Sequence, residues 1–159
     1  MPDRSAADAI HRRLAELGLT LPAAAAPAAN YVPWVVAGNL LHVSGQLPMQ
    51  DGKVAVTGKL GGGLTLEQGQ EAARLCALNI LAQVQAACGD LGRVRRCVKL
   101  GGFVNATPDF TDHPKVVNGA SDLMVAVLAE AGRHARFAVG VAGLPFDAAV
   151  EVDAVFEIG

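Results

Sequence analysis

An alternating run, VEVDAVFEI at 150–158, limits the possible folds of this chain more than any other feature. Every second residue from Val150 to Ile158 is apolar, whereas Glu151, Asp153 and Glu157 fill three of the four positions between them. Successive side chains of a strand point to opposite faces. One face of this strand therefore suits a core, and the other suits water, a partner or a ligand. We expect a sheet that helices cover on one side only.

The remaining periodicities predict the order β-β-β-α-β-α-β-β. Glycine-containing turns at Gly38 and Gly52 separate the first strands, and Thr65 with Gln68 carries the signature of a capping box at a helix start. Strands mostly joined by hairpins, together with two helices of similar length, favour a single-domain α+β fold with both helices on one face. The expected strands cover 31–36, 40–45, 53–58, 94–104, 136–142 and 148–158, and the expected helices cover 65–89 and 111–132.

An additional helix is predicted before the first strand. Ser5 suits its N-cap, the apolar stripe Ile10, Leu14 and Leu17 gives it one buried face, and Gly18 ends it. An alanine- and proline-rich linker follows. We therefore divide the chain into an N-terminal segment, 1–29, and a domain proper, 30–159.

Composition excludes several functional classes. A net charge of −2 gives little electrostatic support for a nucleic-acid partner, and we interpret the short basic run at 93–99 as a solvated strand face. No uninterrupted apolar stretch is long enough for a membrane span or a secretory signal. The spacing of Cys76, Cys88 and Cys97 indicates buried, reduced thiols, so we expect a cytoplasmic protein.

Common cofactor and metal motifs are missing. In GKLGGG at 58–63 the lysine precedes the glycines, the reverse of a phosphate-binding loop. The four histidines share no metal-like spacing. We therefore predict neither a metal nor an organic cofactor, and any chemistry must use an arginine, carboxylates and backbone groups.

Arg136 is the residue whose role most needs explaining. It precedes the apolar strand FAVGV and shares its side with two small residues, Ala138 and Gly140. If 136–142 and 148–158 form a hairpin, Arg136 lies roughly opposite Glu151. An exposed cross-strand ion pair and a ligand-binding guanidinium then both remain open.

Two blocks narrow this choice. GNLLHVSGQLP at 38–48 and ARFAVGVAGLPFDAAVEV at 135–152 resemble the Rid (YjgF-like) family of reactive-intermediate deaminases. The resemblance extends from about residue 30 to residue 158 and implies a chorismate-mutase-like fold, in which two helices pack on one face of a mixed sheet. It also implies a homotrimer with ligand clefts between subunits.

The same resemblance implies cofactor-independent hydrolysis of 2-imino or enamino acids to 2-oxo acids and ammonia. Arg136 matches the residue that holds the substrate carboxylate, and Glu151 matches the acidic residue near the attacking water. Further positions that match the lining of the cleft are Tyr31, Ser44, Gly45, Asn118 and Ala138.

Departures from the family pattern indicate a divergent, longer subgroup. Ala138 stands where a cysteine is common, the segments around 61–65 and 107–115 are extended, and the N-terminal helix is additional. The main alternative is a non-catalytic trimer that binds a small carboxylate-bearing metabolite. A purely structural trimer and the ribonuclease label attached to this family rank below it, the latter because the chain is acidic and has few aromatic residues.

Overall fold

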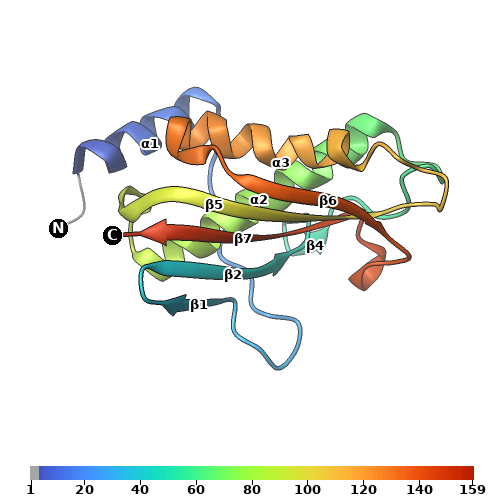
Figure 1. The fold of residues 1–159 in the computed structure, drawn as a ribbon, viewed down its shortest axis with the longest axis horizontal. Helices are drawn as coiled ribbons and strands as arrows, with labels where there is room; N and C mark the ends of the chain where they lie inside the picture. The colour runs from blue at the N-terminus through green and yellow to red at the C-terminus, as the bar shows by residue number, and fades with distance from the viewer. Residues whose placement is uncertain (1–3) are drawn as a thin grey trace.

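A computed structural model describes residues 4–159 of the chain, so the first three residues of the predicted N-terminal segment lie outside the described part. Figure 1 shows a sheet with its helices gathered on one side. The helices are α1 (Arg4–Glu16), α2 (Leu66–Cys88) and α3 (His113–Leu128), and the strands are β1 (Trp34–Ala37), β2 (Leu40–Gln46), β3 (Met49–Gln50), β4 (Lys53–Val54), β5 (Val94–Asn105), β6 (Ala135–Val141) and β7 (Val150–Ile158). Short 3-10 turns occur at Leu91–Arg93, Ala129–Gly132 and Pro145–Asp147.

The main sheet is mixed, with the strand order β1-β2-β7-β5-β6. β5 and β6 run parallel, and the other neighbouring strands run antiparallel. This arrangement confirms the α+β fold with a mixed sheet, two helices on one face and an additional N-terminal helix.

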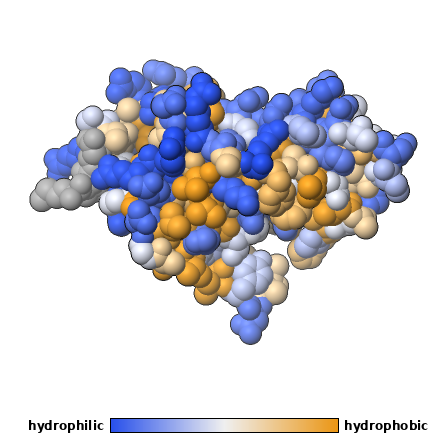
Figure 2. Space-filling model, in the orientation of Figure 1, coloured by the Kyte–Doolittle hydropathy of each residue, from blue (hydrophilic) through white to orange (hydrophobic). Residues whose placement is uncertain are grey.

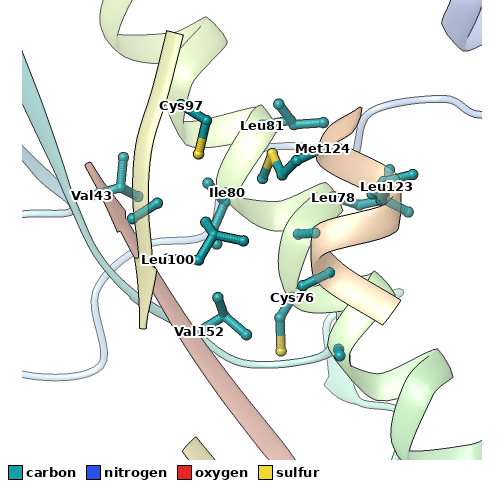
Figure 3. Close-up of a cluster of buried hydrophobic side chains, with 14 of the residues drawn as sticks. Val43, Cys76, Leu78, Ile80, Leu81, Cys97, Leu100, Leu123, Met124 and Val152 are labelled. Carbon is teal, nitrogen blue, oxygen red and sulfur yellow. The ribbon is translucent and has the colours of Figure 1, made fainter. Parts of the chain in front are cut away.

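The alternation that predicted a one-sided sheet is confirmed in β7. Its apolar positions are buried, whereas Glu151, Asp153 and Glu157 are only partly covered. Figure 3 shows the covered side, where Leu100 and Val152 of the sheet face Ile80 of α2 and Met124 of α3. A continuous apolar core therefore fills the space between the sheet and the helices.

Local sequence signals account for the ends of α2. Thr65 accepts a hydrogen bond from the Gln68 amide, and the Gln68 side chain accepts one from the Thr65 amide, which completes the predicted capping box. Gly89 ends the helix in the left-handed conformation, with φ of 76°.

All three cysteines are free and buried, as predicted. Burial raises the pKa of the Cys97 thiol to about 12.

The third predicted strand is wrong in extent. Only Lys53–Val54 is extended, and it pairs with Met49–Gln50 in a separate two-stranded sheet. Asp51 and Gly52 form its tight turn with positive φ values of 52° and 78°. The residues that follow pair elsewhere: the Ala149 amide donates to the Val56 carbonyl, and Thr57 forms an isolated bridge with Ala148.

The predicted hairpin between residues 136–142 and 148–158 is also wrong. β6 pairs with β5, not with β7, because α3 is the crossover of a β5-α3-β6 unit that returns the chain parallel to β5. β5 separates β6 from β7, so Arg136 opposes Leu100 and Glu151 opposes Phe103. The expected alignment of Arg136 with Glu151 does not occur.

α1 packs against the 3-10 turn at Leu91–Arg93 and against α3. Ile10 and Leu14 join the core, and Arg13 Nε donates to the Val127 carbonyl at 2.8 Å. The predicted stripe is confirmed at these two leading positions, whereas Leu17 is 46% exposed. The division of the chain at residues 29 and 30 stays a prediction.

Candidate active site

Arg136 lies on β6 and directs its side chain at α3, on the helix-covered side of the sheet. Its register partner Leu100 is a buried core residue, and paired residues of adjacent strands share a face. The guanidinium donates from Nη1 to Ser121 Oγ and from Nη2 to the Pro114 carbonyl, both at 3.0 Å. Within residues 4–159 no carboxylate pairs with it. The charge of Arg136 is therefore available to an external anion.

Two further predicted residues lie beside Arg136. Asn118 falls between Pro114 and Ser121 in an i, i+4, i+7 spacing, which places all three on one face of α3. Asn118 is exposed, and its side-chain amide has no hydrogen-bond partner in the described part of the chain. Ala138 follows Arg136 on the same side of β6 and packs against the core. Arg136, Asn118 and Ala138 form one group, the arginine group.

A histidine side chain fills the space beside Gly140. The His113 imidazole covers that glycine, and its ring packs edge-to-face on Phe110 with centroids 5.4 Å apart. A pocket of about 320 Å³ opens at this end of β6. It is lined by Ala106, Thr107, Pro108, Phe110, His113, Gly140, Val141 and Ala142. The pocket lies on the same strand as Arg136, but Arg136 is not part of its lining.

The other four predicted residues gather elsewhere. The Glu151 side chain lies against Gly45, where an added Cβ would be 3.0 Å from the carboxylate carbon. Ser44 Oγ donates to the Val32 carbonyl at 2.8 Å, which ties β2 to the segment that carries Tyr31. Tyr31 is 48% exposed and, together with Gly45, lines a pocket of about 110 Å³. These four residues form the glutamate group.

Electrostatics favour a basic carboxylate in the glutamate group. Partial burial raises the pKa of Glu151, and the negative charge of Asp153 raises it further. Burial also raises the pKa of Asp153, although a hydrogen bond from the Gly101 backbone and the charge of Lys99 oppose this shift. A carboxylate with a raised pKa takes up a proton more readily near neutral pH, as a general base must.

The two groups do not meet within this chain. Glu151 points to the open face of the sheet, since it alternates with the buried Val150 and Val152. Arg136 lies on the covered face at the far side of β5. One small molecule cannot contact both groups of the same chain.

The open face of the sheet carries exposed apolar side chains as well as the carboxylates of β7. Figure 2 shows hydrophobic side chains gathered over the strands on this side. On the edge strand β6, Val139 is 41% exposed and pairs with Phe103, which stacks edge-to-face on Phe137 with centroids 5.3 Å apart. Val35, on the opposite edge strand β1, is 52% exposed. Exposed apolar side chains of this kind are a feature of interaction sites.

Sequence reasoning missed Ser121 and His134. Ser121 Oγ lies 2.8 Å from His134 Nε2, and His134 Nδ1 lies 2.6 Å from the Gly132 carbonyl. A signal was present, since His134 precedes Arg136 by two residues, just before β6, and the two-residue period of an extended segment places both on one side. The helical spacing of Asn118 and Ser121 likewise places them on one face of α3.

Two structural tests concern metals and membranes. Among residues 4–159, no three histidine, cysteine or acidic side chains lie close enough together to bind a metal ion. None of the helices described has both the length and the apolar character needed to cross a bilayer.

The chain is similar in sequence and structure to known proteins. The family model described as "YjgF/chorismate_mutase-like, putative endoribonuclease" matches residues 11–157. The chain belongs to this YjgF-like family. The family resemblance of the two sequence blocks is thereby confirmed.

Individual YjgF-like relatives differ in how closely they follow this chain. The protein TCP17 of Trypanosoma cruzi is 60% identical over 146 residues, which are 91% of each chain. The crystal structure of Atu1372 from Agrobacterium tumefaciens has a TM-score of 0.92 at 56% identity, covering 98% of this chain and 96% of that one. E. coli TdcF with bound serine has a TM-score of 0.64 at 25% identity, covering 88% and 96%. This chain is thus closer in structure to Atu1372 than to TdcF.

Proposed function

We propose that the protein hydrolyses reactive 2-imino or enamino acids to 2-oxo acids and ammonia, in clefts between the subunits of a homotrimer. The observation that carries this proposal is the unpaired charge of Arg136, which is held by α3 beside Asn118. A guanidinium binds a carboxylate through two parallel hydrogen bonds. Membership of the YjgF-like family and the serine bound to TdcF support a small amino-acid-derived ligand.

The proposed cleft combines the arginine group of one protomer with the glutamate group of its neighbour. The separation of the two groups within one protomer supports this composition, as does the apolar open face of the sheet. Cyclic symmetry would then build the same complete site at every interface.

The reaction balances without a cofactor. Arg136 binds the substrate carboxylate, and Asn118 helps to orient the imine. Glu151 accepts a proton from water as the water oxygen bonds to the imine carbon, and it passes this proton to the imine nitrogen to give a carbinolamine. Glu151 then transfers the hydroxyl proton to the amino nitrogen as the carbon–nitrogen bond breaks, so that ammonia leaves and the oxo group forms. Positioning supplies most of the acceleration, since imines already hydrolyse in water.

A coupled assay tests the activity. A pyridoxal-phosphate dehydratase generates the imine from serine or threonine, and 2-oxo acid is followed over time. Arg136→Ala should lower kcat/KM by about 100-fold or more, since two charge-assisted hydrogen bonds are lost, and Arg136→Lys should restore little. Arg133→Ala removes an exposed arginine on the same segment and is the matched control. Unchanged oxo-acid release by Arg136→Ala would contradict the proposal.

Complementation tests the shared cleft. Arg136→Ala and Glu151→Gln, each inactive alone, are co-expressed with different tags. In randomly mixed cyclic trimers, roughly one quarter of the clefts would contain both native residues. Recovery of about that fraction of wild-type activity is the expected result. No recovery in verified mixed trimers would mean that both residues act from one protomer.

The second candidate is a trimer that binds a carboxylate-bearing metabolite without turning it over. The serine bound to TdcF supports this alternative as well, because serine is an amino acid and has no carbon–nitrogen double bond to hydrolyse. Serine binding that depends on Arg136, combined with no acceleration of imine hydrolysis, would select it.

A further inference from the structure

Ser121 connects Arg136 to a histidine that the proposed reaction does not use. Its Oγ lies 3.0 Å from Arg136 Nη1 and 2.8 Å from His134 Nε2. The other ring nitrogen of His134 lies 2.6 Å from the Gly132 carbonyl. All four groups are therefore linked in one chain of hydrogen bonds from the backbone to the guanidinium.

Only one proton arrangement satisfies this chain when His134 is neutral. The Gly132 carbonyl can only accept, so His134 Nδ1 must carry the hydrogen. Nε2 is then an acceptor, and the Ser121 hydroxyl must donate to it. The lone pairs of Ser121 Oγ are left facing Arg136, which can only donate. The direction of every bond thus follows from the fixed carbonyl at one end.

We propose that Ser121 and His134 are positioning residues that set the orientation of the Arg136 guanidinium for carboxylate binding. This inference rests on the proposed function, because it assigns Arg136 to the substrate. Ser121 fixes Nη1, and the Pro114 carbonyl fixes Nη2. Two of the five N–H donors of the guanidinium are used in this way, and a carboxylate can take two of the others. His134 acts through Ser121, because its Nε2 accepts the hydrogen bond from the Ser121 hydroxyl.

Without its hydrogen bond to His134, the Ser121 hydroxyl would be free to rotate. The hydroxyl hydrogen could then point at the guanidinium, which has no acceptor for a hydrogen bond. The Arg136 guanidinium would then spend less time in the orientation that binds a carboxylate. This loss weakens substrate binding more than it slows the chemical step. The effect should therefore appear in KM more than in kcat.

Nuclear magnetic resonance tests the proton arrangement directly. Histidine ¹⁵N shifts are measured on the intact protein at pH 8, with the His134 signals assigned by loss in His134→Gln. The Nδ1–H tautomer is expected, and the Nε2 shift should move in Ser121→Ala. An Nε2–H tautomer or a charged ring would overturn the inference. This readout needs no enzymatic activity, so it stands whether or not the proposed function holds.

Kinetics test the consequence for binding. Ser121→Ala should raise KM for the dehydratase-generated imine by roughly 10-fold, the expected effect of one charge-assisted hydrogen bond, with little change in kcat. Ser121→Thr keeps the hydroxyl and should restore KM, while His11→Ala changes an exposed histidine of α1 and is the matched control. An unchanged KM in a folded Ser121→Ala protein would overturn the inference. Failure of the proposed function would instead appear as an unchanged KM in Arg136→Ala.

Discussion

The carboxylate of Glu151 lies directly over Gly45, so that a Cβ at position 45 would be 3.0 Å from its Cδ and Oε2 atoms. The glycine therefore provides the space in which this side chain rests. Real Cβ contacts are longer, and the flexible glutamate would have to move aside. The position of the candidate base thus depends on a neighbouring residue that has no side chain of its own.

Gly45→Ala should displace Glu151 and leave the fold intact, because the end of a flexible side chain moves more easily than backbone. A displacement of about 1 Å costs on the order of 100-fold in rate, so we expect kcat/KM to fall by 10-fold or more. Gly143→Ala places a methyl group in open space and is the matched control. Wild-type kinetics for Gly45→Ala would show that Glu151 need not occupy this position.

Glu151→Gln should stabilise the protein at neutral pH. Burial and the charge of Asp153 raise the pKa of Glu151 in the folded state, so folding favours its protonated form. Stability is then lost as the pH rises from the unfolded pKa through the folded one. A higher Tm than that of wild type is expected at pH 7, with the difference shrinking toward pH 4, below the ordinary glutamate pKa of about 4.3.

Thermal melts at several pH values provide this measurement. Glu130→Gln changes an exposed carboxylate and should shift Tm little at either pH. A Tm advantage of Glu151→Gln that grows as the pH falls would contradict the sign of the effect.

Gly119→Ala should destabilise the packing of α3 on α2. A Cβ at position 119 would overlap the backbone carbonyl of Gln70, and backbone cannot rotate away as a side chain does. Overpacking of this kind costs roughly 1–3 kcal/mol, measurable by urea unfolding. Gly143→Ala should leave the free energy of unfolding nearly unchanged. Equal stabilities of the two variants would mean that the helices separate at little cost.

Leu14→Ala tests whether α1 is an integral part of the fold. Leu14 is buried in the common core, and truncation of a buried leucine costs roughly 2–5 kcal/mol. Leu17, three residues further along, is 46% exposed, and Leu17→Ala should cost far less. If the two variants unfold at the same urea concentration, α1 contributes little to stability.

Much of the fold was predictable because burial on one face leaves a period in the sequence. Thr65, Gln68 and Gly89 mark the ends of α2 through local hydrogen bonds and backbone conformation. The alternation from Val150 to Ile158 gave the two faces of the sheet. These features depend on residues close together in the chain.

The partner of β6 was not predictable in this way. Residues 142–149 can connect two antiparallel neighbours, or they can carry the chain past an intervening strand, and local pattern does not distinguish these. The register of Arg136 with Leu100 depends on the crossover through α3. For the same reason, the contact of Ser121 with Arg136 was missed, while the motif blocks supplied Arg136 and Glu151 as candidates.

β7 is the last strand along the chain, yet it occupies the middle of the sheet, between β2 and β5. During translation, β2 can pair with β1 and β5 can pair with β6, but the inner edge of each pair has no partner until residues 150–158 leave the ribosome. A nascent chain that stalls before this segment would expose two unpaired strand edges, which invite aggregation or a chaperone. Synthesis must therefore run through the final strand before the protein can complete its sheet.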